Sequence, residues 1–397
     1  MRIALVGIYG GNARDFNPGS FMLAYITVLA LKKRIPNAEF EVFTFDDYWK
    51  DSAPKKEIID GVTVTFVERD NPESLSSIIE GFNGLVVGGD NLWTFQDLSH
   101  FRQIVRDIKT FIGTNYKDVW LLEVGDLFKK ATPRVVFNCV SSRSSIDVIN
   151  KWRKSLTRAC ERASYIGVRD YNVEKILSND WELKNIRMVP DPVLGLMPES
   201  LYGSPTELDF IKSEKPVLGV AIRPAFAGAF AEVFNNLKEE FDKYHICFYS
   251  YSTMHKHWEA NGMFRRWIDR GDVSYIDRPL SPSMAFHLTG RFDVVLNDCY
   301  HGTIAAIIQG KPVIPIRFRE QEVSRRAQLF KMLDLPDRSI RITAAHTPEG
   351  HLKNVANLME QLPMLLSSPV SVPENSLNHV RSLVEKHFDE MANALMK

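Results

Sequence analysis

The side chains of this sequence that are best suited to chemistry follow one another in a single short stretch: Asn297, Asp298, Cys299, Tyr300 and His301. A carboxylate, a thiol, a phenol and an imidazole can each exchange protons or bind a charged ligand. Crowded together, they indicate a reaction centre, with His301, Asp298 and Cys299 as candidate catalytic residues. The competing interpretation is a tight turn whose polar side chains only satisfy backbone groups.

The elements on either side of this stretch place it at the edge of a sheet. An apolar run over 292–296 predicts a buried strand, because it is short and contains β-branched residues. Small and apolar residues from Gly302 onward predict a helix that stops at Gly310, since Pro312 cannot continue it. Ligands of open α/β sheets bind where strands end and helices begin, and the N–H groups of a helix start favour anions.

Similar turns follow other strand-like runs and contain further candidate binding residues. Glycines let a backbone approach a ligand closely, and arginines pair with carboxylate or phosphate. In the first half of the chain the candidates are Gly10, Gly11, Asn12, Gly88, Gly89, Asp90, Asp97 and Arg169. In the second half they are Arg223, Arg317 and Arg319, with Arg325 and Arg326 next in the chain. Tight turns, helix caps and solvated helix faces are the alternative roles.

Strand and helix patterns alternate along the chain, which predicts an α/β fold. With 397 residues the chain is longer than a single domain with one hydrophobic core usually is. We therefore expect a domain over 1–198, a linker over 199–216 and a second domain over 217–345. Helical segments over 346–397 are expected to pack on these domains. One apolar stripe supports this expectation: Leu377, Val380, Val384, Met391 and Leu395.

Three local patterns give more detailed expectations. Ser20 is the expected N-cap of a helix that runs to about Arg34, and a second helix is expected over 146–163. The glycine-bearing loop before the first helix has neither G-x-G-x-x-G nor P-loop spacing, so it predicts no nucleotide cofactor. The tract over 255–257, His-Lys-His, lacks a third ligand at zinc-site spacing, so we interpret it as a solvated loop.

The composition excludes several classes of protein. Hydrophobic residues make up 45% and charged residues 25% of the chain, which is typical of a globular protein. Lys+Arg and Asp+Glu balance at 49 each, so no overall field attracts nucleic acid. There is no run of about 20 apolar residues to span a bilayer, and no signal-peptide pattern at the start. With four scattered cysteines, these features favour a cytoplasmic protein whose oligomeric state the sequence leaves open.

Taken in order, the motifs resemble those of the polysaccharide pyruvyl transferase family over residues 1 to about 340. The resembling segments are Gly7-Ile8-Tyr9-Gly10-Gly11-Asn12 (family G-Y-x-G-x-N), Gly88-Gly89 with Asp97 (G-G-G-x-x-x-D), Val168-Arg169-Asp170 (V-R-D), Asp191-Pro192 (D-P) and Tyr300-His301-Gly302 (R-L-H-G/A). One position departs, because the family carries an arginine two residues before its histidine and this chain has Cys299 there. Either Arg223, Arg317 or Arg319 substitutes for that arginine, or the donor differs, or the activity has drifted.

The resemblance implies two Rossmann-like domains in a GT-B-like arrangement with an interdomain cleft, the first on the acceptor side and the second on the donor side. Family members move the enolpyruvyl unit of phosphoenolpyruvate onto two hydroxyls of a sugar, which leaves a pyruvyl ketal and releases phosphate. This activity belongs to exopolysaccharide biosynthesis for the cell envelope. The implied co-substrate is phosphoenolpyruvate, with no separate cofactor and no metal. The implied acceptor is a sugar or a lipid-linked glycan.

The resemblance also assigns roles to residues. It maps the family's histidine to His301 and its anion-binding arginine to Arg169, and it places Tyr300 and Gly302 beside the substrate. An imidazolium at a helix start is a suitable proton source for C3 of the enol, so we expect His301 to be the acid. Asp298 or Asp97 would take the proton of the attacking hydroxyl.

Cys299 has two open roles. Its thiol would protonate the enol or add to its C2, or it is a buried structural thiol. Two other functions also stay open for the whole chain. One is a GT-B glycosyltransferase that uses a nucleotide sugar. The other is a catalytically lapsed family member that acts as a binding subunit, which the missing motif arginine favours.

Overall fold

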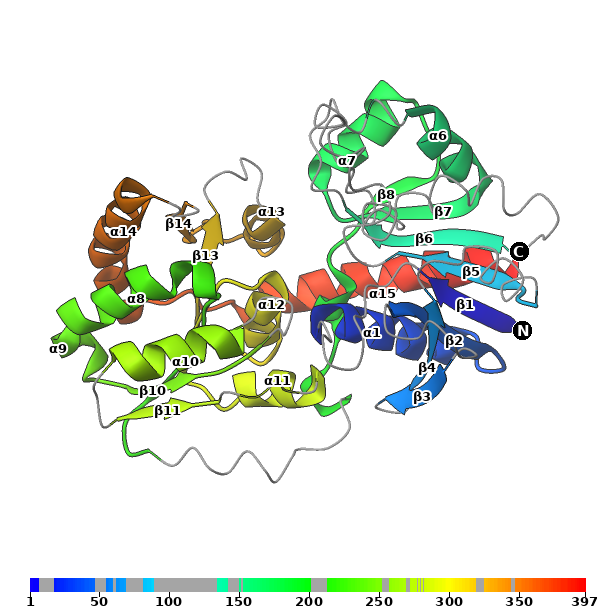
Figure 1. Ribbon diagram of the computed structural model, residues 1–397. Helices are drawn as coiled ribbons and strands as arrows, with labels where there is room; N and C mark the ends of the chain where they lie inside the picture. Colours follow the sequence, from blue (N-terminus) through cyan, green and yellow to red (C-terminus); the bar gives the residue numbers. More distant parts are fainter. Residues whose placement is uncertain are drawn as a thin grey trace, which may run out of the picture. The chain divides into compact units, whose positions relative to one another are not determined.

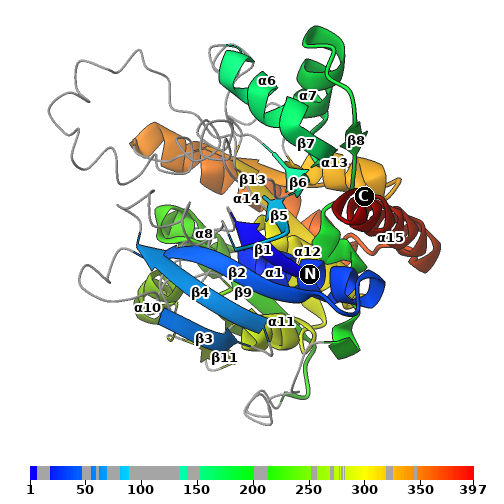
Figure 2. The ribbon, with the colours of Figure 1, turned by 90° about the vertical axis from the view of Figure 1, so that its right-hand side faces the viewer.

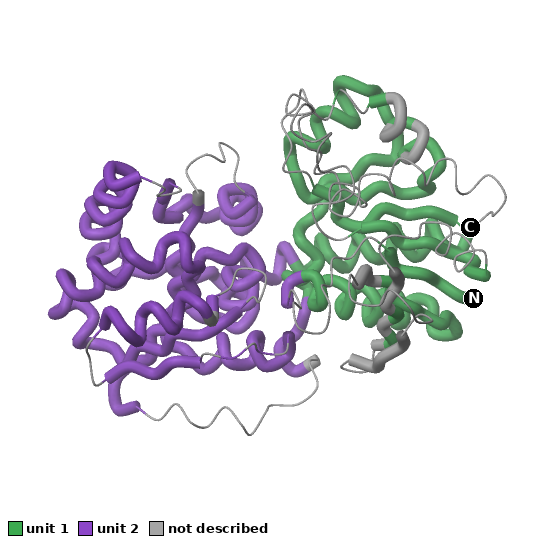
Figure 3. The backbone as a smooth tube through the Cα atoms, viewed as in Figure 1, with its two compact units in different colours: residues 1–13, 20–195, 381–397 green, residues 14–19, 196–380 purple. Residues whose placement is uncertain are grey.

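The computed structural model describes residues 1–6, 18–46, 55–59, 62–68, 81–88, 134–141, 150, 153–200, 213–251, 257–268, 272–276, 278, 280, 282–318, 325–343 and 347–397. The chain divides into two compact units (Figure 3). Unit 1 comprises residues 1–13, 20–195 and 381–397, and unit 2 comprises residues 14–19 and 196–380. The last helix, Glu374–Met396, is therefore shared between the units: it begins in unit 2, and from Arg381 onward it belongs to unit 1.

Unit 1 is built on an eight-stranded sheet among the described residues, in the order β3-β4-β2-β1-β5-β6-β7-β8 (Figure 1). Among the strands that the structure describes in this sheet, only β3 and β4 pair antiparallel. The strands are β1 (Arg2–Val6), β2 (Glu39–Asp46), β3 (Lys55–Ile59), β4 (Val62–Glu68), β5 (Gly84–Val87), β6 (Arg134–Val140), β7 (Ala163–Val168) and β8 (Ile186–Met188). The whole of β5 and nearly all of β1 and β6 are buried, as expected for parallel strands covered on both faces.

The helices of unit 1 include α6 (Arg153–Arg162), α7 (Tyr171–Lys175), most of α15 (Glu374–Met396) and, from Ser20 onward, α1 (Pro18–Arg34). In Figure 2 and Figure 1 alike, α15 lies beside the sheet. Arg134 Nη1 of β6 donates to the carbonyl of Leu395 at 2.7 Å. The predicted apolar stripe of this helix is buried along its whole length, from Leu377 to Leu395. None of the described helices is long and apolar enough to cross a membrane.

A buried chain of hydrogen bonds fixes α15 to this sheet. Tyr165 Oη of β7 lies 2.7 Å from His387 Nδ1, and His387 Nε2 lies 2.8 Å from Asn138 Oδ1 of β6. Asn138 Nδ2 then donates to Thr27 Oγ1 of α1 at 2.9 Å. Burial lowers the pKa of His387 to about 3, and the nearby Arg34 charge lowers it further, so the imidazole is neutral at ordinary pH.

Unit 2 contains a six-stranded, fully parallel sheet in the order β11-β10-β9-β12-β13-β14. The strands are β9 (Val217–Ala221), β10 (His245–Phe248), β11 (Val273–Tyr275), β12 (Val294–Asn297), β13 (Val313–Phe318) and β14 (Ile340–Ile342). The helices are α8 (Pro224–Asn236), α9 (Lys238–Phe241), α10 (His257–Trp267), α11 (Pro282–Thr289), α12 (Tyr300–Ile308), α13 (Arg325–Met332) and α14 (Pro348–Ser367).

Aromatic side chains fill the core between this sheet and its helices. The rings of Phe248 and Phe264 stack at 4.4 Å, and Phe234 meets Phe248 edge-on at 5.5 Å. Gly219 in β9 makes room for another ring, because a Cβ there would lie 2.2 Å from Phe292. This close packing fixes the positions of the central strands, and with them the starting points of the turns that follow.

The structure corrects some details of the sequence-based expectations. Helix α1 begins at Pro18, so Ser20 lies inside the helix and is not its cap. Proline is favoured in the first turn of a helix, which explains the earlier start. Ala163 opens β7 instead of closing a helix. The three short strands β3, β8 and β14 were not predicted, because each is too short to show a clear alternation.

Candidate active site in unit 2

The reactive stretch lies at the carboxyl edge of the second sheet, as predicted. Strand β12 ends at Asn297 and α12 begins at Tyr300, so Asp298 and Cys299 form the turn between them. Asn297 pairs in register with Ala221 of β9 and with Pro315 of β13. The turns that follow these three neighbouring strands therefore meet at one edge.

Asn297 holds the turn in shape. Its Oδ1 accepts from the backbone N–H of Cys299 and from Thr303 Oγ1, both at 3.2 Å. A Cβ on Gly302 would lie 3.3 Å from the same oxygen, so the glycine lets α12 begin close to the strand. Asn297 Nδ2 is buried and has no hydrogen-bond partner. The end of β12 thus carries a buried donor whose hydrogen bond is not satisfied within the described part of the protein.

Asp298 is bound by an arginine and a histidine. Its Oδ2 accepts from Arg223 Nε at 2.8 Å and from the Arg223 backbone N–H at 3.0 Å. Its Oδ1 lies 3.1 Å from His257 Nε2, and both of these side chains are buried. The helix that follows is capped at Cys299, not at Asp298. Asp298 therefore anchors two neighbouring elements, which makes it a poor general base.

His257 is a site residue that the sequence-based interpretation missed. The solvated loop expected over 255–257 is wrong for this residue, which opens α10 and is completely buried. The available signal was its helical spacing from the buried Asn261, Phe264 and Ile268. Residues 255 and 256 lie outside the described residues.

The thiol of Cys299 is buried within the turn. Burial raises its pKa above that of an ordinary cysteine, and the neighbouring Asp298 charge acts in the same direction. The Gly302 backbone N–H, Arg326 and Arg223 oppose this shift. Because the nucleophile would have to be the thiolate, this environment disfavours covalent attack by Cys299.

The arginines at this edge differ in how far they are already paired. Arg317 Nη2 forms an ion pair with Asp337 at 2.9 Å, and Arg325 Cζ lies 5.4 Å from the ring centroid of Tyr300. Arg326 is only 7% exposed, and its Nε has no hydrogen-bond partner. Burial lowers the pKa of its guanidinium to about 10, against the opposing effects of Cys299 and Asp298. Among the described residues, no carboxylate forms an ion pair with Arg326.

His301 lies in the first turn of α12 and is 5% exposed. Its ring centroid is 5.2 Å from that of Tyr300 at an interplanar angle of 71°. Gly19, which also belongs to unit 2, is required beside it, because a Cβ there would lie 1.9 Å from His301 Nδ1. The imidazole is therefore held between Tyr300 and a glycine that the sequence did not single out.

The candidate residues of unit 1 have mainly structural contacts. Arg169 is buried, forms an ion pair with Asp191, and donates from Nε to Ser141 Oγ at 3.3 Å. Asp170 caps α7. Gly88 follows β5 with a φ of 114°, a conformation that suits glycine. The other predicted binding residues lie outside the described residues: Gly10, Gly11, Asn12, Gly89, Asp90, Asp97 and Arg319.

Within the described part of the chain, no cluster of three or more histidine, cysteine or acidic side chains is placed to hold a metal.

Comparisons with known proteins give a family and a fold. A family model described as polysaccharide pyruvyl transferase matches residues 17–318. A comparison with curated proteins finds no match.

Solved structures similar to this chain include the UDP-GlcNAc 2-epimerase from Methanocaldococcus jannaschii, at 12% identity and a TM-score of 0.52 over 90% of this chain and 93% of that one. A putative UDP-N-acetylglucosamine 2-epimerase from Listeria monocytogenes gives 11% identity and 0.54 over 98% and 97%. An E. coli trehalose-6-phosphate protein bound with UDP-2-fluoro glucose gives 10% and 0.54 over 100% and 99%. At such identities the likeness shows the fold alone, which is a GT-B-like one with two Rossmann-like units.

Proposed function

Because this chain belongs to the polysaccharide pyruvyl transferase family, we propose that it transfers the enolpyruvyl unit of phosphoenolpyruvate onto a sugar as a pyruvyl ketal. The observation that carries this proposal is the buried guanidinium of Arg326, which lacks a carboxylate partner among the described residues. A charge held out of water without a counterion is costly, so the site favours an anionic ligand.

The charges at this edge do not balance in the protein alone. Asp298 is the carboxylate of the turn, and Arg223 and His257 already occupy both of its oxygens. Arg326 adds a second guanidinium, which senses the charge of Asp298 but forms no ion pair with it. Phosphoenolpyruvate carries a phosphate and a carboxylate, and arginine binds both groups well.

Buried donors at the same sheet edge support an oxygen-rich ligand. Asn297 Nδ2 at the end of β12 has no partner, and neither has Ser250 Oγ, which follows β10. Leaving a buried donor unpaired costs free energy that a bound phosphate or carboxylate would recover. Arg326 is thus the best candidate to replace the arginine that the family carries at the position of Cys299, ahead of Arg317, which is paired with Asp337.

In the proposed reaction, the first sugar hydroxyl adds to C2 of the enol while His301 donates a proton to C3. The hydroxyl proton returns His301 to its acid form. The second hydroxyl then attacks C2, the C2–O bond to phosphate breaks, and phosphate leaves with the second hydroxyl proton. Arg326 and Asn297 hold the anionic groups, whereas Asp298 positions Arg223 and His257. Cys299 remains a thiol and forms no bond.

Thermal unfolding with candidate donors tests this function. We expect phosphoenolpyruvate to raise the melting temperature of the full chain, because it binds the folded state only. Arg326→Gln should remove most of that shift, whereas Arg266→Gln, an exposed control in α10, should keep it. With a sugar acceptor, phosphate release should accompany ketal formation. A shift with UDP-sugars and none with phosphoenolpyruvate would instead indicate a glycosyltransferase, and no shift with either would indicate a binding subunit.

A further inference from the structure

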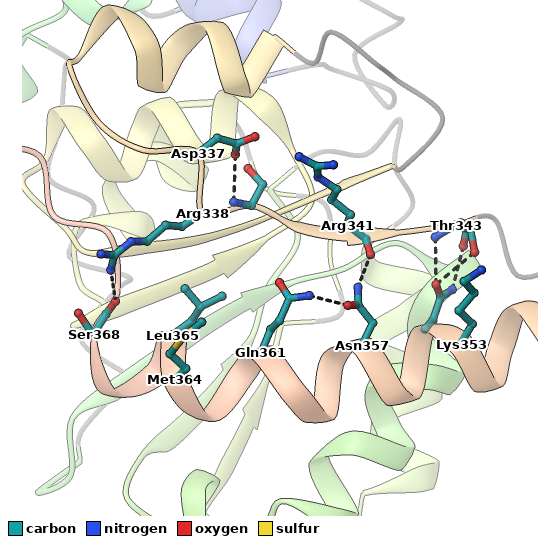
Figure 4. Close-up of a pocket in the computed structure, with 12 residues that line it drawn as sticks. Asp337, Arg338, Arg341, Thr343, Lys353, Asn357, Gln361, Met364, Leu365 and Ser368 are labelled. Atoms are coloured by element: carbon teal, nitrogen blue, oxygen red, sulfur yellow. Dashed lines mark hydrogen bonds between the residues drawn. The ribbon is translucent and has the colours of Figure 1, made fainter.

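A polar hollow of about 760 Å³ lies in unit 2 between the edge strand β14 and helix α14 (Figure 4). Strand β13 lies between β14 and β12, and no lining residue of the hollow comes from the turn after β12, so the hollow is distinct from the candidate active site. Its walls come from the segment around β14 on one side and from successive turns of α14 on the other. The residue pattern did not predict this strand, and none of its residues was a candidate binding residue.

Amide side chains organise the hollow. In Figure 4, Asn357 and Gln361 point from α14 toward β14. Asn357 Nδ2 donates to the carbonyl of Arg341 at 2.5 Å, and Gln361 Nε2 donates to Asn357 Oδ1 at 2.5 Å. Asn354 bonds both backbone groups of Thr343, at 2.8 and 2.9 Å. The backbone groups at this edge, which a further strand could otherwise pair with, are thus hydrogen-bonded to the side-chain amides of Asn354 and Asn357.

The hollow carries an excess of positive charge. Arg338, Arg341 and Lys353 line it, and the carboxylate among its lining residues, Asp337, is paired with Arg317 at 2.9 Å. No described carboxylate lies within ion-pair distance of Arg341 or Lys353. Exposed cations gain little from distant charges, so an anionic group bound in the hollow would be their nearest partner.

Two further features point to a ligand with hydroxyl groups and an apolar face. Ser339 is 7% exposed, lines the hollow, and its Oγ has no hydrogen-bond partner. Met364 is 61% exposed and offers an apolar surface in the same hollow. None of the lining residues is aromatic, so the stacking platform of a single-stranded nucleic-acid site is absent from them.

We propose that this hollow is a binding site for an acidic saccharide. Arg341 and Lys353 would pair with its carboxylate or phosphate group, and Ser339 and Gln361 would hydrogen-bond its hydroxyls. The C–H face of a sugar ring would rest on Met364. Cations, amides, a buried unpaired hydroxyl and one apolar side chain together match an anionic sugar better than a simple ion, which needs neither the amides nor the methionine.

Binding of a defined oligosaccharide tests this site. The probe is an oligosaccharide with one glucuronic acid per disaccharide, and its carboxyl-reduced form is the neutral counterpart. By calorimetry on the full chain, without any donor, we expect the acidic form to bind about tenfold more tightly than the neutral form. The double variant Arg341→Gln/Lys353→Gln should lose that preference. The charge-matched control Arg266→Gln/Lys238→Gln, at exposed positions elsewhere in unit 2, should retain it.

Further variants and ligands keep the test specific. Ser339→Ala should weaken binding of the acidic and the neutral oligosaccharide by the same factor, since the Ser339 hydroxyl would bond to a sugar hydroxyl and not to the acidic group. Equal binding of both oligosaccharides to the wild-type protein would overturn the proposal. Binding of anionic lipid vesicles or of inorganic phosphate, without binding of the oligosaccharide, would overturn it too. Since no donor is present, a protein that binds the acidic oligosaccharide but never consumes phosphoenolpyruvate would retain this site and lose the proposed reaction.

Discussion

His257 Nε2 lies 3.1 Å from Asp298 Oδ1, and both side chains are buried. The two residues are 41 positions apart in the chain, at the start of α10 and in the turn after β12. The other oxygen of the same carboxylate holds Arg223, which follows β9. One buried carboxylate therefore joins three segments at the sheet edge, and the geometry of the candidate site depends on it.

Asp298→Asn should destabilise the protein, because the substitution leaves Arg223 without its counterion. We expect the free energy of unfolding to fall by about 2–3 kcal/mol. Urea denaturation measures this change, with the exposed Asp334→Asn as the matched control. A loss below about 0.5 kcal/mol, the range of ordinary surface substitutions, would mean that Asp298 does not anchor the edge.

Arg326→Met should have opposite effects on stability and on donor binding. Arg326 has no ion pair among the described residues and its Nε has no hydrogen-bond partner, so replacing this buried guanidinium by an apolar side chain of similar length should raise the free energy of unfolding by about 1 kcal/mol. The same variant should lose affinity for phosphoenolpyruvate by at least about tenfold. Denaturation without ligand and calorimetry with phosphoenolpyruvate give the two values. A variant that is destabilised and binds the donor normally would make Arg326 a structural residue.

His301→Asn should separate catalysis from donor binding. An amide of similar shape cannot deliver a proton to C3 of the enol, so turnover should fall by about 10²- to 10⁴-fold. The dissociation constant for phosphoenolpyruvate should change only a few-fold, because the guanidinium of Arg326 remains. Phosphate release under saturating donor measures the first quantity and calorimetry the second. An unchanged turnover number would remove His301 from the mechanism.

Cys299 should resist alkylation in the folded protein. Burial raises the pKa of its thiol, so the reactive thiolate is rarer than in a free cysteine, and the side chain is also out of reach. Mass spectrometry after iodoacetamide treatment near neutral pH should find this cysteine unmodified, and unfolding in urea should expose it. Cys299→Ala should retain turnover. An enolpyruvyl adduct on Cys299 would contradict both expectations.

His387 should make stability fall in mild acid. Its pKa is lowered to about 3 in the folded protein, so between that value and the ordinary 6.5 the unfolded state binds the extra proton. The contribution of His387 to the free energy of unfolding is therefore fully present above about pH 6.5 and is lost as the pH falls below that value. The loss should reach roughly 2 kcal/mol by about pH 5. Urea denaturation of the wild type and of His387→Gln, each at about pH 6.5 and about pH 5, isolates this loss of stability, because the variant has no imidazole at position 387 to titrate.

Residue types and their local spacing were enough to predict the type of fold and the position of the reactive turn. The short apolar run over 292–296 predicted a buried strand, and Gly310 with Pro312 predicted the end of the helix that follows it. Because strand and helix periodicities are local, Asp298, Cys299 and His301 could be placed at a sheet edge from neighbouring residues alone. The same local order made the family resemblance visible, and the family match confirms it.

Which side chains pair across the sheet edge became visible only in the folded chain. Nothing near Asp298 in the chain indicates that His257 and Arg223 bind it. Nothing near Arg317 or Arg326 shows that the first pairs with Asp337 whereas the second keeps a buried Nε without a hydrogen-bond partner. The hollow beside β14 likewise depends on Asn357 meeting the carbonyl of Arg341 across two elements. Burial and charge pairing arise only when distant segments pack together, so residue types and spacing could suggest candidates there but could not choose among them.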